Sequence, residues 1–520
     1  MQAFKHWPCW VLVAVLLGAM LSLVNTARQR TGGTWIYPLD DTYIHMAIAK
    51  NVAQHGVWGV TPDRFTSSCS SPVWVGLLAL DYRLCGVNEL APRLLNYIFA
   101  VLLVVVGYWL LHRLRLTPGV IFATMLGVVL LTPLPVVALT GMEHVLHALL
   151  TMVFVYCAAR ALTGENDWRP LLILAPVLVA TRYEGLFLVG IAAGLFLLRK
   201  KPVQAVAIGI AGALPVVVYG LISVSKGWFF LPNSILLKGK IPQGLVQGLG
   251  GTAVQQLIRA PHLAGLLAGV VVFAVCLAWK RKTFWNAPVI AAAMYVAGSL
   301  AHLQFASTGW LYRYEAYLMA LGILVLGWSS GELLRCTARG RLWMALVLMV
   351  ALGPATYRAG CAVGLVPQAC QNLYEQQYQM GRLLRRYYQG ASVAANDIGA
   401  INYLADIHCS DLMGLAHLEF ARARHEQTYN TAIIDQLTKR DQVTIAIVFD
   451  SWFTRFGGLP ASWVPVGKWE IPNCIWSEGA VVTFYATDAV EAGRLQAHLH
   501  QFAAELPKDV RRFEARPVGF

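Results

Sequence analysis

Charged side chains are scarce in this sequence. Asp, Glu, Lys and Arg together make up 13% of its 520 residues, whereas hydrophobic residues make up 57%. An average soluble domain carries about 25% charged residues, so the composition excludes a soluble protein of this length, and it excludes intrinsic disorder as well. The ten cysteines include no Cys-x-x-Cys pair, which argues against a zinc ribbon or a redox motif. An integral membrane protein is the class that remains.

Acidic residues are fewer than basic ones. The chain has 27 Asp and Glu against 41 Lys and Arg, which gives a formal net charge of +14. In a soluble protein this excess would suggest nucleic acid as a partner. In a membrane protein it is explained by cytoplasmic loop charges that set the topology and by contact with anionic lipid head groups. We therefore expect membrane lipids, and no nucleic acid, among the partners.

Long apolar runs dominate the chain up to about residue 358. A helix needs roughly 20 apolar residues to cross a bilayer, and eleven runs, two of them short, are candidates. These runs are 9–27, 93–111, 118–139, 144–162, 170–181, 186–198, 202–223, 261–279, 285–305, 313–331 and 341–358. The sequence thus predicts an α-helical polytopic membrane protein with about eleven transmembrane helices.

Short basic clusters predict how these helices are oriented. With the N-terminus in the cytoplasm, the basic clusters between spans all fall on the cytoplasmic side, as the positive-inside rule requires. The clusters are Arg113 with Arg115, Arg160 with Arg169, Arg199–Lys201, Lys280–Lys282, and Arg335 with Arg339 and Arg341. The agreement holds only if segment 72–88, which carries Asp81 and Arg83, lies on the outer face as an amphipathic helix.

The polar segments fall on the outer face in this topology. They are loop 28–92, loop 224–260 and the C-terminal part of the chain. We expect a transmembrane domain over 1–358 and a soluble α/β domain over 359–520, on the periplasmic or extracellular side. Residues 393–406 predict a strand, a turn and a helix, and 442–450 and 480–488 predict buried strands.

Two adjacent carboxylates, Asp40 and Asp41, stand just outside the first span at the start of a helical pattern. One interpretation is an acidic first turn that stabilises the helix dipole. The other is a general base, since like charges this close split their pKa values and leave one carboxylate poised to accept a proton. The pair would also suit a divalent cation such as Mg²⁺ or Mn²⁺.

Further polar residues lie at the outer ends of predicted spans. Arg182, Lys238 and Arg313 fall at one membrane depth, where they would bind a phosphate or pyrophosphate head group. The alternative is that the two arginines form local ion pairs with Glu184 and Glu315, because charges at this depth mark either a site or an internal pair. The other candidate site residues are His45, Glu143, Glu184, Asn233 and Tyr314.

Six short motifs in this order resemble the GT-C superfamily of polytopic membrane glycosyltransferases, including arabinofuranosyltransferase-like proteins. They are Asp40-Asp41-Thr42-Tyr43-Ile44, Ser70-Ser71-Pro72-Val73-Trp74, Gly141-Met142-Glu143, Thr181-Arg182-Tyr183-Glu184-Gly185, Leu231-Pro232-Asn233-Ser234 with Lys238, and Arg313-Tyr314. The chain departs from the family pattern at Thr42 and Tyr183, where Ala and Pro are usual. Segments 396–400 and 411–415 resemble a strand-and-turn signature that follows in such proteins.

The resemblance implies an inverting glycosyltransferase on the outer face of the bacterial inner membrane. It would move a sugar from a polyprenyl-phosphate donor to a glycan, lipid or protein acceptor of the cell envelope. Asp40 or Asp41 would deprotonate the acceptor hydroxyl, and Arg182, Lys238 and Arg313 would neutralise the leaving phosphate. The rival class is a membrane transporter or a lipid- or glycan-binding protein without transferase activity, because a broken helix with charge at membrane depth also suits transport.

Overall fold

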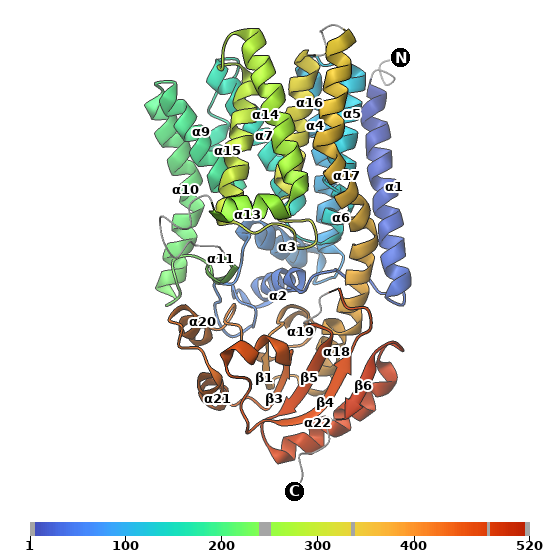
Figure 1. Ribbon diagram of the computed structural model, residues 1–520. Coiled ribbons are helices and arrows are strands. Elements are labelled where there is room, and N and C mark those ends of the chain that lie inside the picture. The colour runs from blue at the N-terminus through green and yellow to red at the C-terminus, as the bar shows by residue number, and fades with distance from the viewer. Residues whose placement is uncertain (1–5, 239–250, 334–337, 476–478, 515–520) are drawn as a thin grey trace.

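The structure is a computed structural model of the full chain, and it describes residues 6–238, 251–333, 338–475 and 479–514. A bundle of long helices forms one end of the molecule and an α/β domain forms the other (Figure 1). The N-terminus lies at the far end of the bundle from this domain (Figure 1). The predicted combination of a polytopic helical part and a C-terminal α/β domain is confirmed.

The described residues contain eight helical segments that are long and apolar enough to cross a membrane. They are α1 (Trp7–Arg30), α4 (Ala91–Arg113), α7 (His144–Thr163), α10 (Pro202–Ser225), α14 (Pro261–Arg281), α15 (Ala287–Phe305), α16 (Ala316–Leu333) and α17 (Ala338–Glu375), which is followed directly by the polar helix α18 (Gln377–Tyr387). Three shorter apolar helices are α5 (Pro118–Leu131), α8 (Leu171–Thr181) and α9 (Gly185–Leu198). The protein is therefore a multi-pass membrane protein, with a helix in each predicted apolar run.

Two of these runs differ from expectation in their ends. The run 118–139 breaks after α5, and a short helix, α6 (Leu134–Leu139), follows Pro133. Proline has no N–H to continue the helical ladder, and its ring clashes with the preceding turn. The last run extends far beyond its predicted end, so the domain boundary expected at 358/359 lies inside α17. A continuous helix therefore leads from the bundle into the α/β domain.

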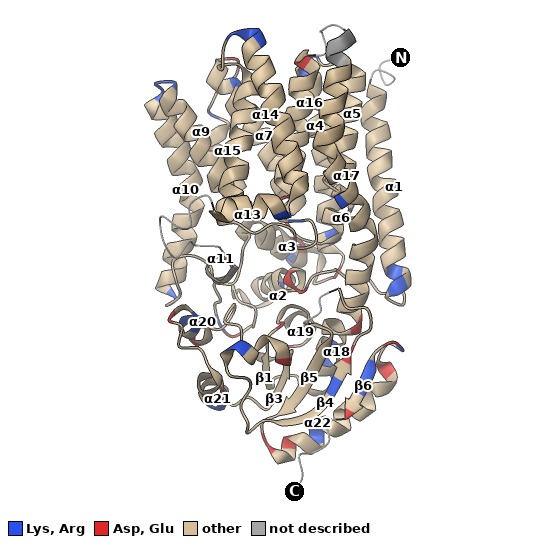
Figure 2. Ribbon diagram, viewed as in Figure 1, with Lys and Arg blue, Asp and Glu red and all other residues tan. Residues whose placement is uncertain are grey.

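The helices of the bundle differ in how much of their surface is buried. α16 and α7 are buried along most of their length, which suits the centre of the bundle. α10 and α1 instead present exposed large apolar side chains, such as Ile210 and Leu21, to the surroundings. An exposed apolar face on a helix of this length is suited to lipid. Figure 2 shows basic residues after α9 and at the end of α14, opposite the α/β domain, whereas the basic residues that end α1 lie on the side of the α/β domain.

Short helices cover the end of the bundle that faces the α/β domain. They are α2 (Asp40–His55), α3 (Pro72–Cys85), α11 (Asn233–Lys238) and α13 (Gly251–Arg259) (Figure 1). α3 starts where Ser71 Oγ accepts the N–H of Trp74 at 3.3 Å, and Pro72 occupies its first turn. With 14 residues, α3 is too short to span a bilayer, in agreement with the predicted surface helix.

A six-stranded sheet forms the core of the α/β domain, with strand order β2-β1-β3-β5-β4-β6. β1 pairs in parallel with β2 and β3, and the remaining pairs are antiparallel. The strands are β1 (Ser392–Ala395), β2 (His408–Asp411), β3 (Ile445–Val448), β4 (Val464–Glu470), β5 (Val481–Ala486) and β6 (Arg511–Glu514). The helices of the domain, besides α18, are α19 (Gly399–Leu404), α20 (Leu418–His425), α21 (Thr431–Arg440), α22 (Ala489–Phe502), and three short 3₁₀ turns, η2 (Asp450–Trp452), η3 (Thr454–Phe456) and η5 (Ala503–Glu505).

Polar contacts fasten α2 to the α/β domain. The carboxylate of Asp40 accepts the backbone N–H groups of Gly399 and Ala400 at 2.6 and 2.8 Å, at the start of α19. Farther along α2, the Lys50 ammonium donates to the Tyr403 carbonyl at 3.1 Å and to Asp406 Oδ1 at 2.9 Å. Lys50 is buried and Asp40 is half-buried. These hydrogen bonds, which are charge-assisted at Lys50, hold the domain at a fixed place against the bundle.

Candidate functional site

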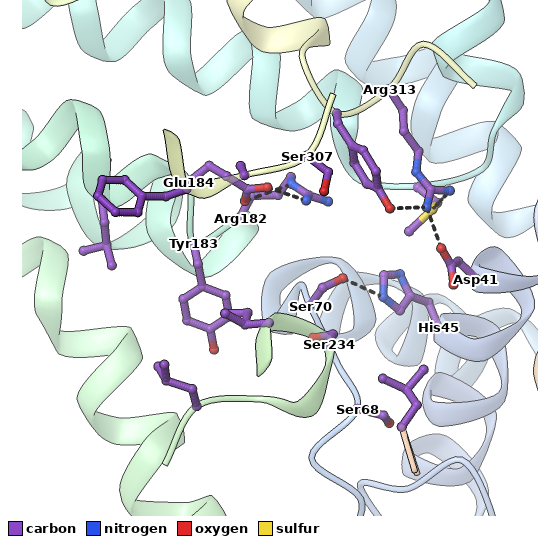
Figure 3. Close-up of a pocket in the computed structure, with 18 of the residues that line it drawn as sticks. Asp41, His45, Ser68, Ser70, Arg182, Tyr183, Glu184, Ser234, Ser307 and Arg313 are labelled. Atoms are coloured by element: carbon purple, nitrogen blue, oxygen red, sulfur yellow. Dashed lines mark hydrogen bonds and ion pairs between the residues drawn. The ribbon is translucent and has the colours of Figure 1, made fainter. Parts of the chain in front are cut away.

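A cavity of ≈ 340 Å³ lies at the end of the bundle that faces the α/β domain. Six of the candidate residues named from the sequence line it: Asp41, His45, Arg182, Glu184, Arg313 and Tyr314. Its other side is apolar and is formed by Phe187, Val216, Leu231, Ile235 and Phe305. Val216 belongs to α10, whose neighbouring residues Leu214 and Val217 are exposed on the lipid-facing surface. We call this space the first cavity (Figure 3).

Arg313 reaches the first cavity from a strained turn before α16. Trp310, Leu311 and Tyr312 all have left-handed backbone conformations, with φ of 39°, 54° and 65°, and such conformations cost roughly 1–2 kcal/mol per L-residue. The Arg313 side chain is 1% exposed, and its Nη2 donates to Asp41 Oδ2 at 2.5 Å. The turn thus holds a buried guanidinium against the Asp41 carboxylate at the cavity wall (Figure 3).

The expected alternative, an Arg313–Glu315 ion pair, is not the pairing that the structure has. Glu315 Oε1 instead accepts from Arg358 Nη2 at 2.5 Å, and His262 Nε2 lies 3.2 Å from the same oxygen. Since the neighbouring carboxylate is occupied elsewhere, Arg313 turns toward α2 and Asp41. The Arg313 guanidinium is therefore paired with Asp41 at the cavity wall and not with a carboxylate of its own turn.

Arg182 carries two ion pairs. Its Nη2 donates to Glu184 Oε1 at 2.6 Å and its Nε to Glu184 Oε2 at 3.2 Å, which is the local pair expected from the sequence. Its Nη1 donates to Glu143 Oε1 at 2.6 Å. The guanidinium still lines the first cavity. Two carboxylates therefore offset the charge of Arg182, whereas one offsets that of Arg313. The Tyr314 ring centroid lies 5.9 Å from the Arg182 guanidinium and 5.0 Å from that of Arg313.

His45 lies on α2, one turn after Asp41, and faces the same cavity. Its Nε2 is 3.3 Å from Ser70 Oγ (Figure 3). Its Nδ1 is 3.6 Å from Glu143 Oε2. Burial lowers the pKa of His45 below its usual value, against the opposing effect of the Glu143 charge. A neutral imidazole here can accept one hydrogen bond and donate another.

Asp40 turns away from the first cavity, although it is adjacent to Asp41. Burial raises the pKa of Asp40 to about 8, and the Asp397 charge raises it further, while the N–H groups of Ala400 and Gly399 oppose the shift. Its side chain lines a second cavity of ≈ 660 Å³ between the bundle and the α/β domain. The two cavities share Asp41, Ile44, Tyr314 and Leu415 in their walls.

Two other candidates are placed by the α11 segment. Asn233 does not face the first cavity, because its Nδ2 donates to the carbonyls of Gly414 and Leu415 in the α/β domain, at 2.9 and 3.3 Å. Its neighbour Ser234 lines the cavity. Lys238 is the last residue of α11, and its side chain lies outside the described residues. The third cation of the predicted phosphate cluster thus stays a prediction.

Four further residues line the first cavity but are not among the candidate site residues predicted from the sequence: Ser68, Ser70, Tyr183 and Ser307. A signal for two of them was present, because Ser68 and Ser70 belong to the serine-rich run before α3, and Tyr183 stands inside the Thr-Arg-Tyr-Glu-Gly motif. Ser307 has no distinguishing local pattern. It reaches the cavity only because the chain turns there between α15 and α16.

The two carboxylates do not offer a ready metal site. Both oxygens of Asp40 accept backbone N–H groups, and Asp41 Oδ2 pairs with Arg313. Across the described ranges no group of three or more His, Cys, Asp and Glu side chains is placed to hold a metal ion. Mg²⁺ prefers several oxygen ligands, and this arrangement does not fit that preference, so we derive no step through a metal.

Comparison with known proteins gives one family match and several similar structures. Residues 371–486, within the C-terminal part, match a family described as a domain of unknown function, DUF8728. No curated protein matches the sequence. Two solved structures of ArnT from Cupriavidus metallidurans are similar. The one bound to undecaprenyl phosphate is 13% identical, covers 93% of this chain and 98% of its own, and has a TM-score of 0.55.

The second structure, ArnT in the apo state, is 14% identical, covers 94% of this chain and 99% of its own, and has a TM-score of 0.57. The similarity extends over the bundle and the α/β domain together, and identity this low is evidence of fold alone. The chain therefore shares the overall fold of these ArnT structures.

Proposed function

We propose that this protein is an inverting membrane glycosyltransferase that uses a polyprenyl-phosphate-linked sugar. The observation that carries the proposal is the Arg313–Asp41 pair, a buried cation and a carboxylate in the wall of a cavity whose opposite side is apolar. This combination provides a place for a lipid tail, a counter-charge for a phosphate and a base for an acceptor. Undecaprenyl phosphate, the ligand of the similar ArnT structure, is a molecule of this kind.

In this proposal the polyprenyl chain lies along the apolar side of the first cavity and the phosphate approaches Arg313. Arg313 and Arg182 stabilise the negative charge that develops on the phosphate as it leaves. Lys238, at the end of α11, is proposed as the third cation. Because the phosphate is a good leaving group once its charge is neutralised, the reaction needs no strong general acid.

Asp41 is proposed as the general base, since it faces the first cavity and Asp40 does not. An acceptor hydroxyl attacks the anomeric carbon and its proton passes to the Asp41 carboxylate. The bond between the anomeric carbon and the phosphate oxygen breaks, and its electron pair leaves with polyprenyl phosphate. Attack from the face opposite the leaving group inverts the anomeric configuration, and a carboxylate base is what inverting sugar transfer to a hydroxyl requires.

Asp40 is proposed to position Asp41 rather than to act as the base, because both of its carboxyl oxygens already accept backbone N–H groups. Its bonds to Gly399 and Ala400 fix the N-terminal end of α2, and thereby the place of Asp41. His45 and Glu143 are proposed to orient the polar side of the same cavity, through Ser70 and Arg182 respectively. The site then lies on the face of the membrane that carries the α/β domain, with the basic loops in the cytoplasm.

The proposal is tested by comparing lipid-linked sugars in cells that lack the protein, in cells complemented with the wild type, and in cells complemented with Asp41→Asn. The donor is expected to accumulate in the first and third strains. Normal levels of every polyprenyl-phosphate sugar in all three strains would rule out this donor class. Binding of undecaprenyl phosphate without any transfer would favour the transporter or lipid-binding alternative.

A further inference from the structure

The second cavity lies next to Asp41, on the side that faces the α/β domain. Its volume of ≈ 660 Å³ is within the range of about 300–1,000 Å³ that is typical of ligand sites. It shares a wall with the first cavity at Asp41 and Tyr314. A molecule bound there would therefore present an atom to the proposed base from the side opposite the lipid.

The walls of this cavity come from the carboxyl ends of the three strands that pair in parallel. Asn396 follows β1, Asp411 ends β2 and Phe449 follows β3, and all three line the cavity. β2 and β3 lie on opposite sides of β1, so the strand order reverses at β1. In open α/β sheets, ligands bind at this reversal point, outside the carboxyl ends of the strands.

Asn396 has an unused donor at that point. Its side chain is 5% exposed, and its Oδ1 accepts the N–H of Phe449 at 3.1 Å, which fixes the amide. Its Nδ2 has no hydrogen-bond partner among the described residues. A buried polar group without a partner is costly, and an oxygen atom of a ligand in the cavity would satisfy it.

The remaining wall combines an aromatic face with acidic and amide groups. Trp452 is partly exposed and stacks on Phe449, with ring centroids 5.8 Å apart and an interplanar angle of 29°. Gln377 Nε2 donates to Asp397 Oδ2 at 2.9 Å, and both residues line the cavity. Among the described residues, the wall holds one cation, Arg424, against the carboxyl groups of Asp40, Asp41, Asp397 and Asp411, so acidic groups outnumber basic ones and the wall disfavours an anionic ligand. A flat aromatic ring beside fixed hydrogen-bonding groups suits a neutral ring that carries hydroxyl groups.

We propose that the second cavity binds the acceptor, and that the acceptor is a saccharide. This inference rests on the proposed transferase function. The lipid-linked donor occupies the first cavity, and the acceptor sugar stacks on Trp452 and accepts a hydrogen bond from Asn396 Nδ2. One of its hydroxyl groups then faces Asp41 from the side of the α/β domain. The α/β domain thereby selects the acceptor, whereas the bundle binds the donor.

The test uses the full-length protein in detergent and free mannose, glucose, galactose and arabinose as probes, with saturation-transfer NMR as the readout. The variants are Trp452→Ala and Asn396→Asp, because Asp keeps the acceptor for Phe449 and removes the unpartnered donor. The matched control is Trp285→Ala, a partly exposed tryptophan that lies against Arg199, in the loop between α14 and α15. Undecaprenyl phosphate binding and melting temperature are measured on every sample.

At least one sugar is expected to bind the wild type and Trp285→Ala, with undecaprenyl phosphate present or absent. Its affinity should fall about 2- to 10-fold in Trp452→Ala, the range expected from loss of one aromatic contact. In transfer assays the same variant should raise KM for the acceptor and leave KM for the donor unchanged. Undecaprenyl phosphate should bind all four proteins equally.

Several results would overturn the inference. One is that no sugar binds, and another is that Trp452→Ala and Asn396→Asp both bind sugar as the wild type does. A third is that undecaprenyl phosphate displaces the sugar, and a fourth is that Trp452→Ala raises KM for the donor alone. If instead the wild type fails to bind undecaprenyl phosphate while sugars still bind, the proposed donor is wrong and the saccharide site stands.

Discussion

The two cavities that meet at Asp41 are lined by residues of different chemical character. The first has an apolar side from the bundle and two buried guanidinium groups, Arg182 and Arg313. The second is formed largely by strand ends and loops of the α/β domain and is rich in carboxylates and amides. The difference shows how two structural layers can surround one carboxylate with an apolar, cationic wall on one side and a polar, acidic wall on the other, as the proposed lipid-linked donor and saccharide acceptor would require.

The largest effect is expected from replacing Asp41, the one carboxylate among the four residues that both cavities share. Asp41→Asn should lower transfer by about 10²- to 10⁴-fold, the usual contribution of a positioned base, and leave undecaprenyl phosphate binding in place. The measurements are the initial rate of transfer and the affinity for undecaprenyl phosphate, both on the same purified Asp41→Asn protein. Near-normal transfer by Asp41→Asn at normal melting temperature would remove Asp41 from the role of base.

The next effect concerns the cations of the first cavity. Arg313→Ala should weaken undecaprenyl phosphate binding by about 10- to 100-fold, in the range of a hydrogen bond to a charged group. Arg182→Ala should weaken it less, since Glu143 and Glu184 already offset that charge. Isothermal titration of each variant measures both.

The control for the arginines is Arg281→Ala. This residue also loses an ion pair, with Glu332 at 2.6 Å, but it ends α14 at the other end of the bundle. Its affinity for undecaprenyl phosphate should equal that of the wild type. Equal affinities for Arg313→Ala and Arg281→Ala would show that Arg313 does not bind the phosphate.

A smaller effect sharpens the contrast between Asp40 and Asp41. The pKa of Asp40 is about 8 in the folded protein, well above that of an exposed Asp. The folded state therefore binds this proton more tightly than the unfolded state, and its contribution to stability is present at low pH and is lost as pH rises from about 4 to 8. Melting temperature measured across this range should decline.

Asp397→Asn provides the matched variant for that pH dependence. It removes the charge that, after burial, does most to raise the pKa of Asp40. The folded pKa should fall, so the variant should lose less melting temperature than the wild type between pH 4 and 8. Identical pH profiles for the two proteins would contradict the interaction of Asp40 with Asp397.

The smallest expected effect is that of chelation. Because the oxygens of Asp40 and one oxygen of Asp41 are already engaged, EDTA should leave the transfer rate unchanged. Loss of activity with EDTA and its return with Mg²⁺ or Mn²⁺ would establish a metal at this pair, as the sequence alone allowed.

Much of the fold follows from local patterns in the sequence. Apolar runs predicted the helices of the bundle because the lipid environment demands a nearly continuous apolar surface. Short apolar runs such as 442–450 predicted β1, β3 and β5 of the α/β domain, whereas β4 and β6 were not predicted. The length of α17 could not be predicted, because its last part is polar and contacts the α/β domain, where Asn372 forms hydrogen bonds with Asn473 and Ile475.

The candidate site was only partly predictable for a geometric reason. Consecutive helical residues point about 100° apart, so Asp40 and Asp41 face different cavities, and the sequence does not say which faces which. The orientation of Asp40 depends on its hydrogen bonds to the N–H groups of Gly399 and Ala400. These two residues are 359 and 360 positions away in the sequence. The second cavity is assembled by the sheet topology from separated segments, and no single motif predicts it.

The central claim is that donor and acceptor occupy separate cavities that meet at Asp41. A structure of the protein with undecaprenyl phosphate bound tests this most directly. The account predicts the phosphate beside Arg313 in the first cavity, the polyprenyl chain against Phe187 and Phe305, and no lipid near Trp452. A phosphate in the second cavity, among Asn396, Asp397 and Trp452, would contradict it.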